Sequence, residues 1–547
     1  MPRRTFNSLR PVGRVLGTIA AMLTCVGTWC GDALGQAPSP PADAPGLSSV
    51  PPAPAATPET PSAPASSDDE YLKQFLETNV TPIDLLSALR LAGEQNSDIL
   101  VAQQRVTEAV ALRQLAAAQF LPTLNAGTSE NTHRGVLQQS DGTIIRVNRD
   151  SLYVGAGAMA IGAGTVTIPG VLWTMNLSQT IYDYLISRQT VDVRGFRSQA
   201  VSQDTLLQVA LAYVELVRAE GQRAVALLAR NDAAEIARLT AVYAERGAGR
   251  QADADRAATE LGRREATLVQ SEGQIGVASA RLCQLLHLDP SLRLHALDEH
   301  VLPQSIVPEP IPLADLLAIA ALNRPEVKEQ RSTVIRALLA LDQARRLPFS
   351  PTVYIGYSAG LFGGGSSIVD QPPLNQPRYG DFSSRQDFDA MAYWTLLNLG
   401  VGNKALIDAA RSRLRSADLQ QVFVLDQIRA EVASAYAKTH ARYAQIRTCE
   451  LAIRSGTDGF KEDMRRILGH QGLPLEAIDS LRLLARSRVD YLNAILDYNR
   501  AQFRLYVALG RPPADLLIRP AGENGEDPAA GRQLPPGWMP AVPPAPK

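Results

Sequence analysis

Aromatic residues are scarce, at 5% of the 547-residue chain, while hydrophobic residues of all kinds make up 45% and charged residues 20%. These proportions are typical of folded proteins and unlike those of disordered chains. The formal net charge is only -1, so nothing in the composition supports a nucleic-acid partner. Few aromatics together with abundant Ala favour closely packed helices over a thick globular core.

Cysteine is also rare. Cys25 and Cys30 belong to the N-terminal segment, and Cys283 and Cys449 lie in helical patterns, where we expect buried free thiols. The six histidines form no helical pair with metal-ligand spacing. We expect neither a Gly-Lys-Ser/Thr phosphate-binding loop nor a Gly-x-Ser-x-Gly nucleophile elbow. We therefore expect no enzyme activity, no cofactor and no metal site.

The two ends of the chain differ in composition from its body. Four arginines precede the short apolar run VLGTIAAMLTCVGTW, and the small residues of ALG stand before Gln36, so residues 1–35 are predicted to be a signal peptide. An uncleaved anchor is the alternative, and lipidation of Cys25 or Cys30 is not expected. Residues 36–67 are predicted to be a Pro-rich linker and residues 519–547 a Pro-rich disordered tail. No later run is apolar enough for a transmembrane helix, so the body is expected to be soluble or to span a membrane as strands.

The body repeats itself. DLLSALRLAGEQNSDIL begins at Asp84 and DLLAIAALNRPEV begins at Asp315, and each helical stretch ends in Phe-x-Pro-Thr before two strands and a long helix. We predict two structural repeats, residues 68–310 and 311–518, each with a helix, a strand pair and a long helical hairpin. The long helices, 191–245 and 404–468, would span about 80 Å and about 100 Å at 1.5 Å per residue. Shorter helices stacked end to end could match them, and narrow apolar stripes favour coiled-coil seams.

The stretch GVLWTMNLSQTIYD, residues 170–183, alternates like a strand. Its apolar face carries Trp173, Met175 and Leu177, and its polar face carries Thr174, Asn176, Ser178 and Thr180. Two strands per repeat cannot close a barrel within one chain, but several copies could, with the apolar face toward lipid and the polar face lining a wet lumen. Residues 129–170 between the first two strands are expected to form a flexible loop, with extra strand pairing as the alternative.

The segments FLPTLN, LSQTIYD, NRPEV, WTLLNLGVGN and YLNAILDYNRAQFRLYVALG, in this order, resemble those of the TolC-like outer membrane efflux proteins. The resemblance implies a mixed, mainly α fold, with a long coiled-coil helical barrel continuing into a trimeric twelve-stranded antiparallel β-barrel, four strands per chain. It also implies an outer-membrane channel of a multi-component efflux or secretion system, a passive homotrimeric duct that works with a periplasmic adaptor and an inner-membrane pump. The alternative is a periplasmic coiled-coil adaptor or envelope scaffold protein.

The far ends of the long helices must turn back. Gly247 and Gly249 stand in the first turn, and Gly469 and Gly472 stand in the second, where glycine suits helix ends. The resemblance implies that these turns form the periplasmic tip that docks the adaptor. It further implies that Glu476 and Asp479, three residues apart on one helical face, form a carboxylate ring at the channel constriction. The simpler alternative is that these acids stabilise the first turn of the returning helix.

Overall fold

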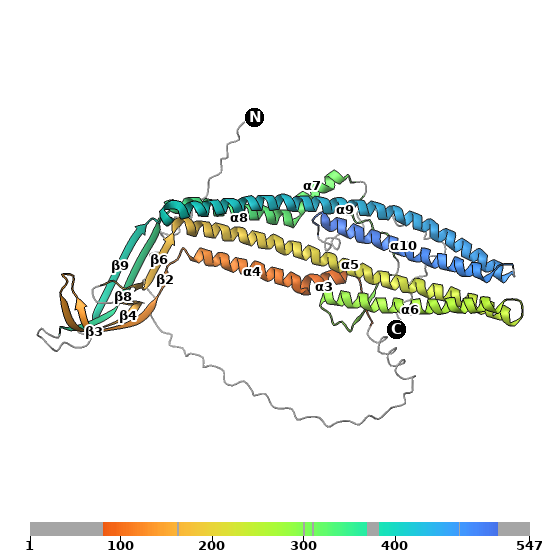
Figure 1. Ribbon diagram of the computed structural model, residues 1–547, viewed down its shortest axis with the longest axis horizontal. Helices are drawn as coiled ribbons and strands as arrows, with labels where there is room; N and C mark the ends of the chain where they lie inside the picture. The colour runs from red at the N-terminus through yellow and green to blue at the C-terminus, as the bar shows by residue number, and fades with distance from the viewer. Residues whose placement is uncertain are drawn as a thin grey trace, which may run out of the picture. The chain divides into compact units, whose positions relative to one another are not determined.

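The computed structural model describes residues 80–160, 164–298, 301–308, 311–368, 382–469 and 471–511. The predicted signal peptide, the Pro-rich linker and the Pro-rich tail lie outside these residues. The described residues all belong to one compact unit, Asp68–Lys547, which is mainly helical with a sheet (Figure 1). No helix in these ranges is long and apolar enough to cross a membrane.

Two very long helices run through this unit. The helices are α3 (Leu85–Gln95), α4 (Ser97–Ala118), α5 (Leu177–Glu245), α6 (Gln251–Leu286), α7 (Leu313–Asn323), α8 (Pro325–Arg346), α9 (Val401–Leu468) and α10 (Pro474–Ala508), with 3₁₀ turns at Leu347–Phe349 and Leu397–Gly400. The α5 helix has 69 residues and α9 has 68, so the predicted long helices are present, although α5 begins well before the predicted residue 191.

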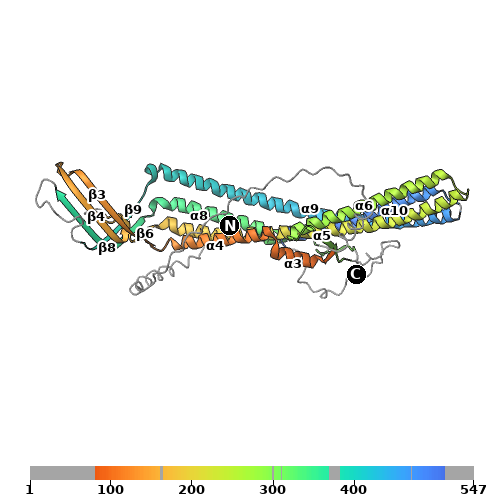
Figure 2. The same ribbon diagram turned by 90° about the horizontal axis from the view of Figure 1, so that it is seen from below.

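The shorter helices are stacked end to end beside the long ones. In the half next to the sheet α4 packs on α5, α5 on α8 and α8 on α9, while in the half away from the sheet α6 packs on α5, α5 on α10 and α10 on α9 (Figure 2). Where α6 meets α4, the amide of Asn96 donates to the carbonyl of Leu285 at 2.9 Å. Where α10 meets α8, the guanidinium of Arg324 donates to the carbonyl of Val507 at 3.3 Å. The helices therefore form one layer of four tracks, ordered α4/α6, α5, α8/α10 and α9.

The strands form four tracks in the same order. The strands are β2 (Thr123–Leu124), β3 (Ala126–Gln138), β4 (Ile144–Ala158), β5 (Ile168–Pro169), β6 (Val171–Asn176), β8 (Thr352–Ile368) and β9 (Ser383–Tyr393). On one side β8 pairs with β9, and on the other it pairs with β6 near its start and with β4 further along. Since β2 pairs with β6 and β3 with β4, the tracks run β2/β3, β4/β6, β8 and β9, each antiparallel to the next.

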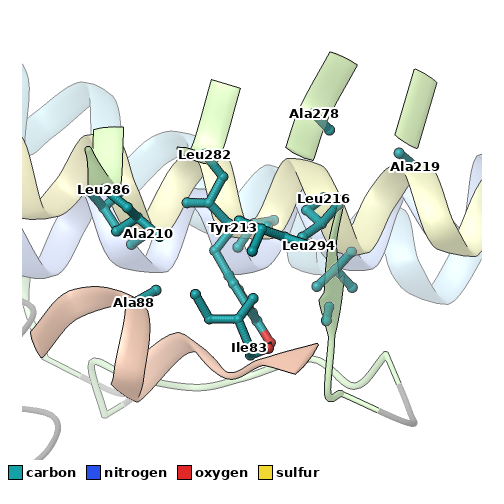
Figure 3. Close-up of a cluster of buried hydrophobic side chains, with 14 of the residues drawn as sticks. Ile83, Ala88, Ala210, Tyr213, Leu216, Ala219, Ala278, Leu282, Leu286 and Leu294 are labelled. Carbon is teal, nitrogen blue, oxygen red and sulfur yellow. The ribbon is translucent and has the colours of Figure 1, made fainter. Parts of the chain in front are cut away.

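A small core fills the level where the stacked helices meet. Strand β1 (Val80–Ile83) pairs in parallel with β7 (Arg293–Ala296), and α3 packs beside them on α5 and α6. Figure 3 shows Tyr213 of α5 reaching between Leu282 and Ile83, and its hydroxyl donates to the carboxylate of Asp298 at 3.0 Å. Burial, together with this carboxylate, raises the pKa of Tyr213. This core ties α3 to the middle of α5, the first long helix.

Two expectations about the strands are wrong. Residues 129–170 are not mainly a loop, because β3 and β4 form a long hairpin across them, which is the extra strand pairing that had been the alternative. The strand that carries Trp173 and Met175 ends at Asn176, so Leu177 does not lie on it but begins α5. The side chain of Asn176 ends the strand by accepting a hydrogen bond from the backbone N–H of Gln179 at 3.0 Å, which is an N-cap.

Candidate functional site

The sheet has two chemically different faces. Trp173 and Met175 of β6 lie opposite Ile355 and Val353 of β8, and directly opposite residues share a face of the sheet. We call this the Trp173 face; it continues with the exposed large side chains of Val154, Tyr357, Leu361 and Phe388. Within a single chain Met175 is buried and Trp173 is half-buried. An exposed apolar band on one face of a sheet indicates a surface that meets lipid or another protein.

The opposite face is polar, and we call it the Thr174 face. Thr174 and Asn176 lie opposite Tyr354 and Thr352 in β8. Further along the sheet this face carries the side chains of Ser358, Arg385, Asp387, Arg149 and His133. The predicted separation of an apolar and a polar face is therefore present from Trp173 to Asn176 of β6. In the first half of β4, by contrast, both faces carry polar side chains, with Asn148 and Asp150 on the Trp173 face and Arg149 on the Thr174 face.

Both edges of the sheet are open. Within the described ranges β3 pairs only with β4, and β9 pairs only with β8. Because the four tracks alternate in direction, β3 and β9 run in opposite directions. The open edge of β9 in one copy could therefore pair antiparallel with the open edge of β3 in another, and such pairing would satisfy backbone groups that edge strands leave without partners.

The edges of the helical layer carry exposed apolar side chains. On the α4/α6 edge these are Val101, Leu112, Leu115, Val269 and Val277, and on the α9 edge they are Leu419, Val422, Phe423 and Leu451, each at least half exposed. The inner tracks differ, because α10 is buried on much of its circumference between α5 and α9. The narrow apolar stripe expected from the sequence therefore underestimates how much of α10 is buried. Both edges of the helical layer, by contrast, expose apolar surface of the kind that contacts another protein chain or lipid.

The predicted glycines lie in the two turns that join α5 to α6 and α9 to α10, which we call the tips. Gly247 has a φ of +70°, which glycine adopts without strain, whereas the C-cap residue Gly469 has a φ of -83°. Gly472 lies so close to α9 that an added Cβ would stand 2.9 Å from the Cβ of Arg466. The first turn therefore needs glycine for its backbone conformation, and the second needs it for space.

Glu476 and Asp479 both have partners within the chain. Glu476 accepts from the backbone N–H of Leu473 at 3.4 Å, an N-terminal cap, and lies 3.3 Å from the guanidinium of Arg466. Asp479 lies 3.2 Å from Arg482, one turn along α10. These contacts support the helix-start role, and they add two basic residues, Arg466 and Arg482, that the sequence did not single out.

Arg482 also joins the two helical hairpins. Its guanidinium donates to the buried carboxylate of Glu260 on α6 at 2.8 Å and 3.1 Å, and Arg264 pairs with the same carboxylate. Burial alone would raise the pKa of Glu260, but the hydrogen bonds from Arg482 and the charge of Arg264 outweigh it and lower that pKa. Sequence spacing gave no signal for this contact, because Glu260 and Arg482 lie 222 residues apart.

Further ion pairs link α5 to α10 above the tip. Arg218 lies 2.6 Å from Asp497, Arg500 lies 2.9 Å from Glu215, and Arg488 lies 3.2 Å from Asp232. Along this interface the arginine comes from α10, then from α5 and then again from α10. The pairs hold α5 and α10, which lie on the two inner tracks of the helical layer, together within one chain.

The sequence contains a nucleophile-elbow motif, but the structure does not place it at the turn from a strand into a helix that the motif requires. Residues 356–360 read Gly-Tyr-Ser-Ala-Gly, which matches the nucleophile-elbow motif, so the expectation that the sequence lacks this motif is wrong. Ser358 lies in the middle of β8, is 2% exposed and accepts a hydrogen bond from the backbone of Gly170. The motif requires a turn from a strand into a helix, so Ser358 is not placed as a nucleophile. Among the described residues no cluster of His, Cys, Asp and Glu could hold a metal ion.

Comparison with solved structures identifies the fold. The chain is similar to the outer-membrane channel OprN, with a TM-score of 0.63 and 17% identity over 80% of this chain and 92% of that chain. The CmeC outer membrane channel of Campylobacter jejuni gives a TM-score of 0.61 and 14% identity over 82% and 90% of the two chains. The outer membrane protein VceC of Vibrio cholerae gives 0.59 and 15% over 78% and 96%. No protein-family model and no curated protein sequence matches the chain.

The chain therefore has the fold of the TolC-like outer membrane channels, which confirms at the level of fold the resemblance inferred from its sequence motifs.

Proposed function

We propose that this protein is the outer-membrane channel of a multi-component efflux or secretion system. Three copies would form a passive duct that spans the outer membrane with strands and the periplasm with helices. The observation that carries this proposal is the four-track wall, in which strands and helices follow the same order and leave the same two edges open. A wall with open edges and a Trp173 face that exposes large apolar side chains is complete only when copies close around an axis in a membrane.

Closure by identical copies follows from the geometry of the edges. The α4/α6 and β2/β3 edge of one copy would meet the α9 and β9 edge of the next, which is a head-to-tail contact that closes into a ring. Two copies would supply eight strands, a number whose interior side chains just fill, whereas twelve strands would leave a wet lumen. The number three also agrees with what the resemblance to TolC-like proteins implies.

The tips are the proposed docking sites for the other components. The turns at Gly247 and Gly249 and at Gly469 and Gly472 would contact a periplasmic adaptor, which would connect the duct to an inner-membrane pump. Glu476 and Asp479 stand beside the second turn and would line the constriction. Energy for export would come from the pump, since the duct needs only to provide a path.

The test is a fractionation followed by a conductance measurement. The proposal expects an outer-membrane trimer that is resistant to detergent until heated and that forms ion-conducting pores in planar bilayers. A soluble periplasmic monomer without pore activity would instead support the adaptor or scaffold. The sheet favours the channel, because an adaptor should carry a compact β-domain between its helices rather than an open sheet at their end.

A further inference from the structure

The chain leaves the sheet briefly between β4 and β6, although these two strands occupy the same track. We call residues 159–160 and 164–170 the inner segment. It begins at Met159, whose φ of 62° turns the backbone sharply, and β5 within it pairs back on the end of β4. At Gly170 the chain returns to the track it left and continues as β6. An excursion of this kind lies over one face of the sheet or the other.

The contacts place it on the Thr174 face. The backbone N–H of Gly170 donates to the hydroxyl of Ser358 at 3.3 Å. Pro169 lies over Gly356, where an added Cβ would stand 2.8 Å from its Cγ. Ala160 and Val166 form a buried cluster with Tyr153, whose register partner is Phe362. Gly356, Ser358 and Phe362 alternate along β8 on the face opposite Ile355, and hence opposite Trp173.

All four tracks of the sheet hold the inner segment. The hydroxyl of Ser129 on β3 accepts from the backbone N–H groups of Met159 and Ala160, at 3.1 Å and 3.3 Å. Tyr153 comes from β4 and Ser358 from β8. From β9, the guanidinium of Arg385 donates to the carbonyl of Gly164, pairs with Asp387 at 2.9 Å and lies 4.9 Å over the ring of Phe362. The described residues of the inner segment are therefore held on the Thr174 face by contacts at Met159, Ala160, Gly164, Val166 and Gly170.

The sheet also makes room for it. Small residues at Gly356, Ser358 and Gly360 follow one another on the Thr174 face of β8, and an added Cβ on Gly360 would stand 2.7 Å from the ring of Tyr153. This explains why the Gly-Tyr-Ser-Ala-Gly pattern occurs in a strand that has no catalytic geometry. Small side chains in a strand commonly mark a site where another backbone approaches closely.

We propose that the inner segment narrows the lumen of the β-barrel and sets an upper size limit on solutes that pass the outer-membrane end of the duct. The proposal rests on the proposed function, because the Thr174 face becomes the lumen wall only if the Trp173 face meets lipid. Residues 159–170 contain no charged residue, and Arg385 is paired with Asp387. The constriction therefore limits size rather than selecting by charge, and one segment from each copy contributes to it.

The direct test uses a cysteine at Thr165, which is exposed on the segment. Channels of the Thr165→Cys variant in planar bilayers are treated with a bulky, water-soluble methanethiosulfonate. We expect conductance to fall in steps, one for each copy in the trimer, and reducing agent should restore it. The matched control is Phe388→Cys on the Trp173 face, where a water-soluble reagent should have no effect, and wild-type channels control for Cys283 and Cys449.

The outcomes separate the two proposals. If no variant and no wild-type protein forms channels, the proposed function fails. If channels form but treatment of Thr165→Cys leaves their conductance unchanged, or Phe388→Cys is the variant that responds, the inner segment does not line the lumen. As a second measurement, Arg385→Ala should raise conductance and let larger polymers enter the channel, because it removes the hydrogen bond to Gly164. Gln386→Ala, on the Trp173 face, should change neither property. Equal behaviour of the two variants would show that Arg385 does not hold the inner segment in the lumen.

Discussion

At Gly221, the lack of a side chain lets α5 and α10 pack closely. An added Cβ would stand 2.9 Å from both δ-carbons of Leu492, which is fully buried. The sequence shows Gly221 as a gap in the apolar stripe of the long helix, but only the packing shows which side chain occupies the gap. Glycine in a helix interior costs about 1 kcal/mol relative to Ala, so its presence there indicates a close contact between elements.

We predict that Gly221→Leu lowers stability, because overpacking a filled contact costs about 1–3 kcal/mol. Gly195→Leu is the matched control, since Gly195 lies on the same helix with no atom within 4 Å of an added Cβ. The measurement is the thermal unfolding midpoint of each purified variant. Equal midpoints for the two variants would show that Leu492 does not fill the space at Gly221.

The buried carboxylate of Glu260 gives a second prediction at this scale. Glu260→Gln should lower the free energy of unfolding by about 1.5–3 kcal/mol near neutral pH, because it removes charged hydrogen bonds from Arg482. The folded state lowers the pKa of Glu260, so its contribution is present above the unfolded pKa and is lost as pH falls through the folded value. The difference between wild type and variant should therefore shrink below about pH 4.

The control for this pH dependence is Glu265→Gln. Glu265 pairs with Arg230 at 3.6 Å, and both side chains are more than two-fifths exposed, so its effect should be small at every pH. Thermal unfolding of the three proteins across the acidic range supplies the measurement. A difference for Glu260→Gln that grows as the pH falls would contradict the assignment.

At the scale of elements, the sequence predicts helices better than strand ends, for identifiable reasons. The long helices have sustained apolar periodicity, which predicts both ends of α9 closely and the end of α5, but not the start of α5 at Leu177. Strand β4 was missed because Arg146, Arg149 and Asp150 interrupt its alternation, as expected where both faces of a strand meet water. Leu177 was placed on β6 because alternation continues by chance into α5, although Asn176 before it is a recognisable N-cap.

The two faces of β6 lead to a prediction about membrane assembly. Trp173→Asp should impair it, because a charged side chain facing lipid costs about 2–4 kcal/mol at mid-bilayer, and less for acids. Thr174→Asp, on the next residue and the opposite face, should be milder because that face is wet. Heat-modifiability on gels compares the fraction of each variant that assembles. Similar assembly of both variants would show that the Trp173 face does not meet lipid.

At the scale of the whole molecule, the single chain is an incomplete wall. Its inner tracks are joined by ion pairs and buried apolar contacts, but its edge helices expose Leu112, Leu115, Val422 and Phe423. Neither the Glu260–Arg482 contact nor the order of the tracks could be predicted from sequence spacing, because both depend on segments far apart in the chain. The open edges of β3 and β9 likewise depend on strand pairing between distant segments, which sequence spacing does not specify.

Disruption of an edge should therefore separate folding from assembly. Phe423→Asp on α9 is expected to reduce trimer formation while leaving the helical content of the chain unchanged, since Phe423 is 62% exposed in a single chain. Gln420→Asp is the control, because it adds the same charge to the same helix at a polar exposed position. Circular dichroism reports the helices, and light scattering in detergent reports the oligomer. Trimer formation by Phe423→Asp at the level of the control would argue against this edge as the interface.

The constriction at the tips is the property that most depends on assembly. In a trimer, Glu476 and Asp479 would bring six carboxylates to the mouth of the duct, but Arg466 and Arg482 partly balance them within each chain. If the carboxylates dominate the potential in the pore, they attract cations, and divalent ions should block conduction. If the arginines balance them fully, the acids only stabilise the start of α10.

We predict that Glu476→Gln combined with Asp479→Asn weakens cation preference and block by divalent cations in planar bilayers, without preventing trimer formation. The reversal potential in a salt gradient measures the preference. Glu462→Gln, which neutralises an exposed acid of α9 paired with Arg465, is the control and should leave selectivity unchanged. Unchanged selectivity in a correctly assembled double variant would confine Glu476 and Asp479 to helix capping. Because the open edges and the apolar Trp173 face do not involve these residues, the proposed duct would be unaffected by that result.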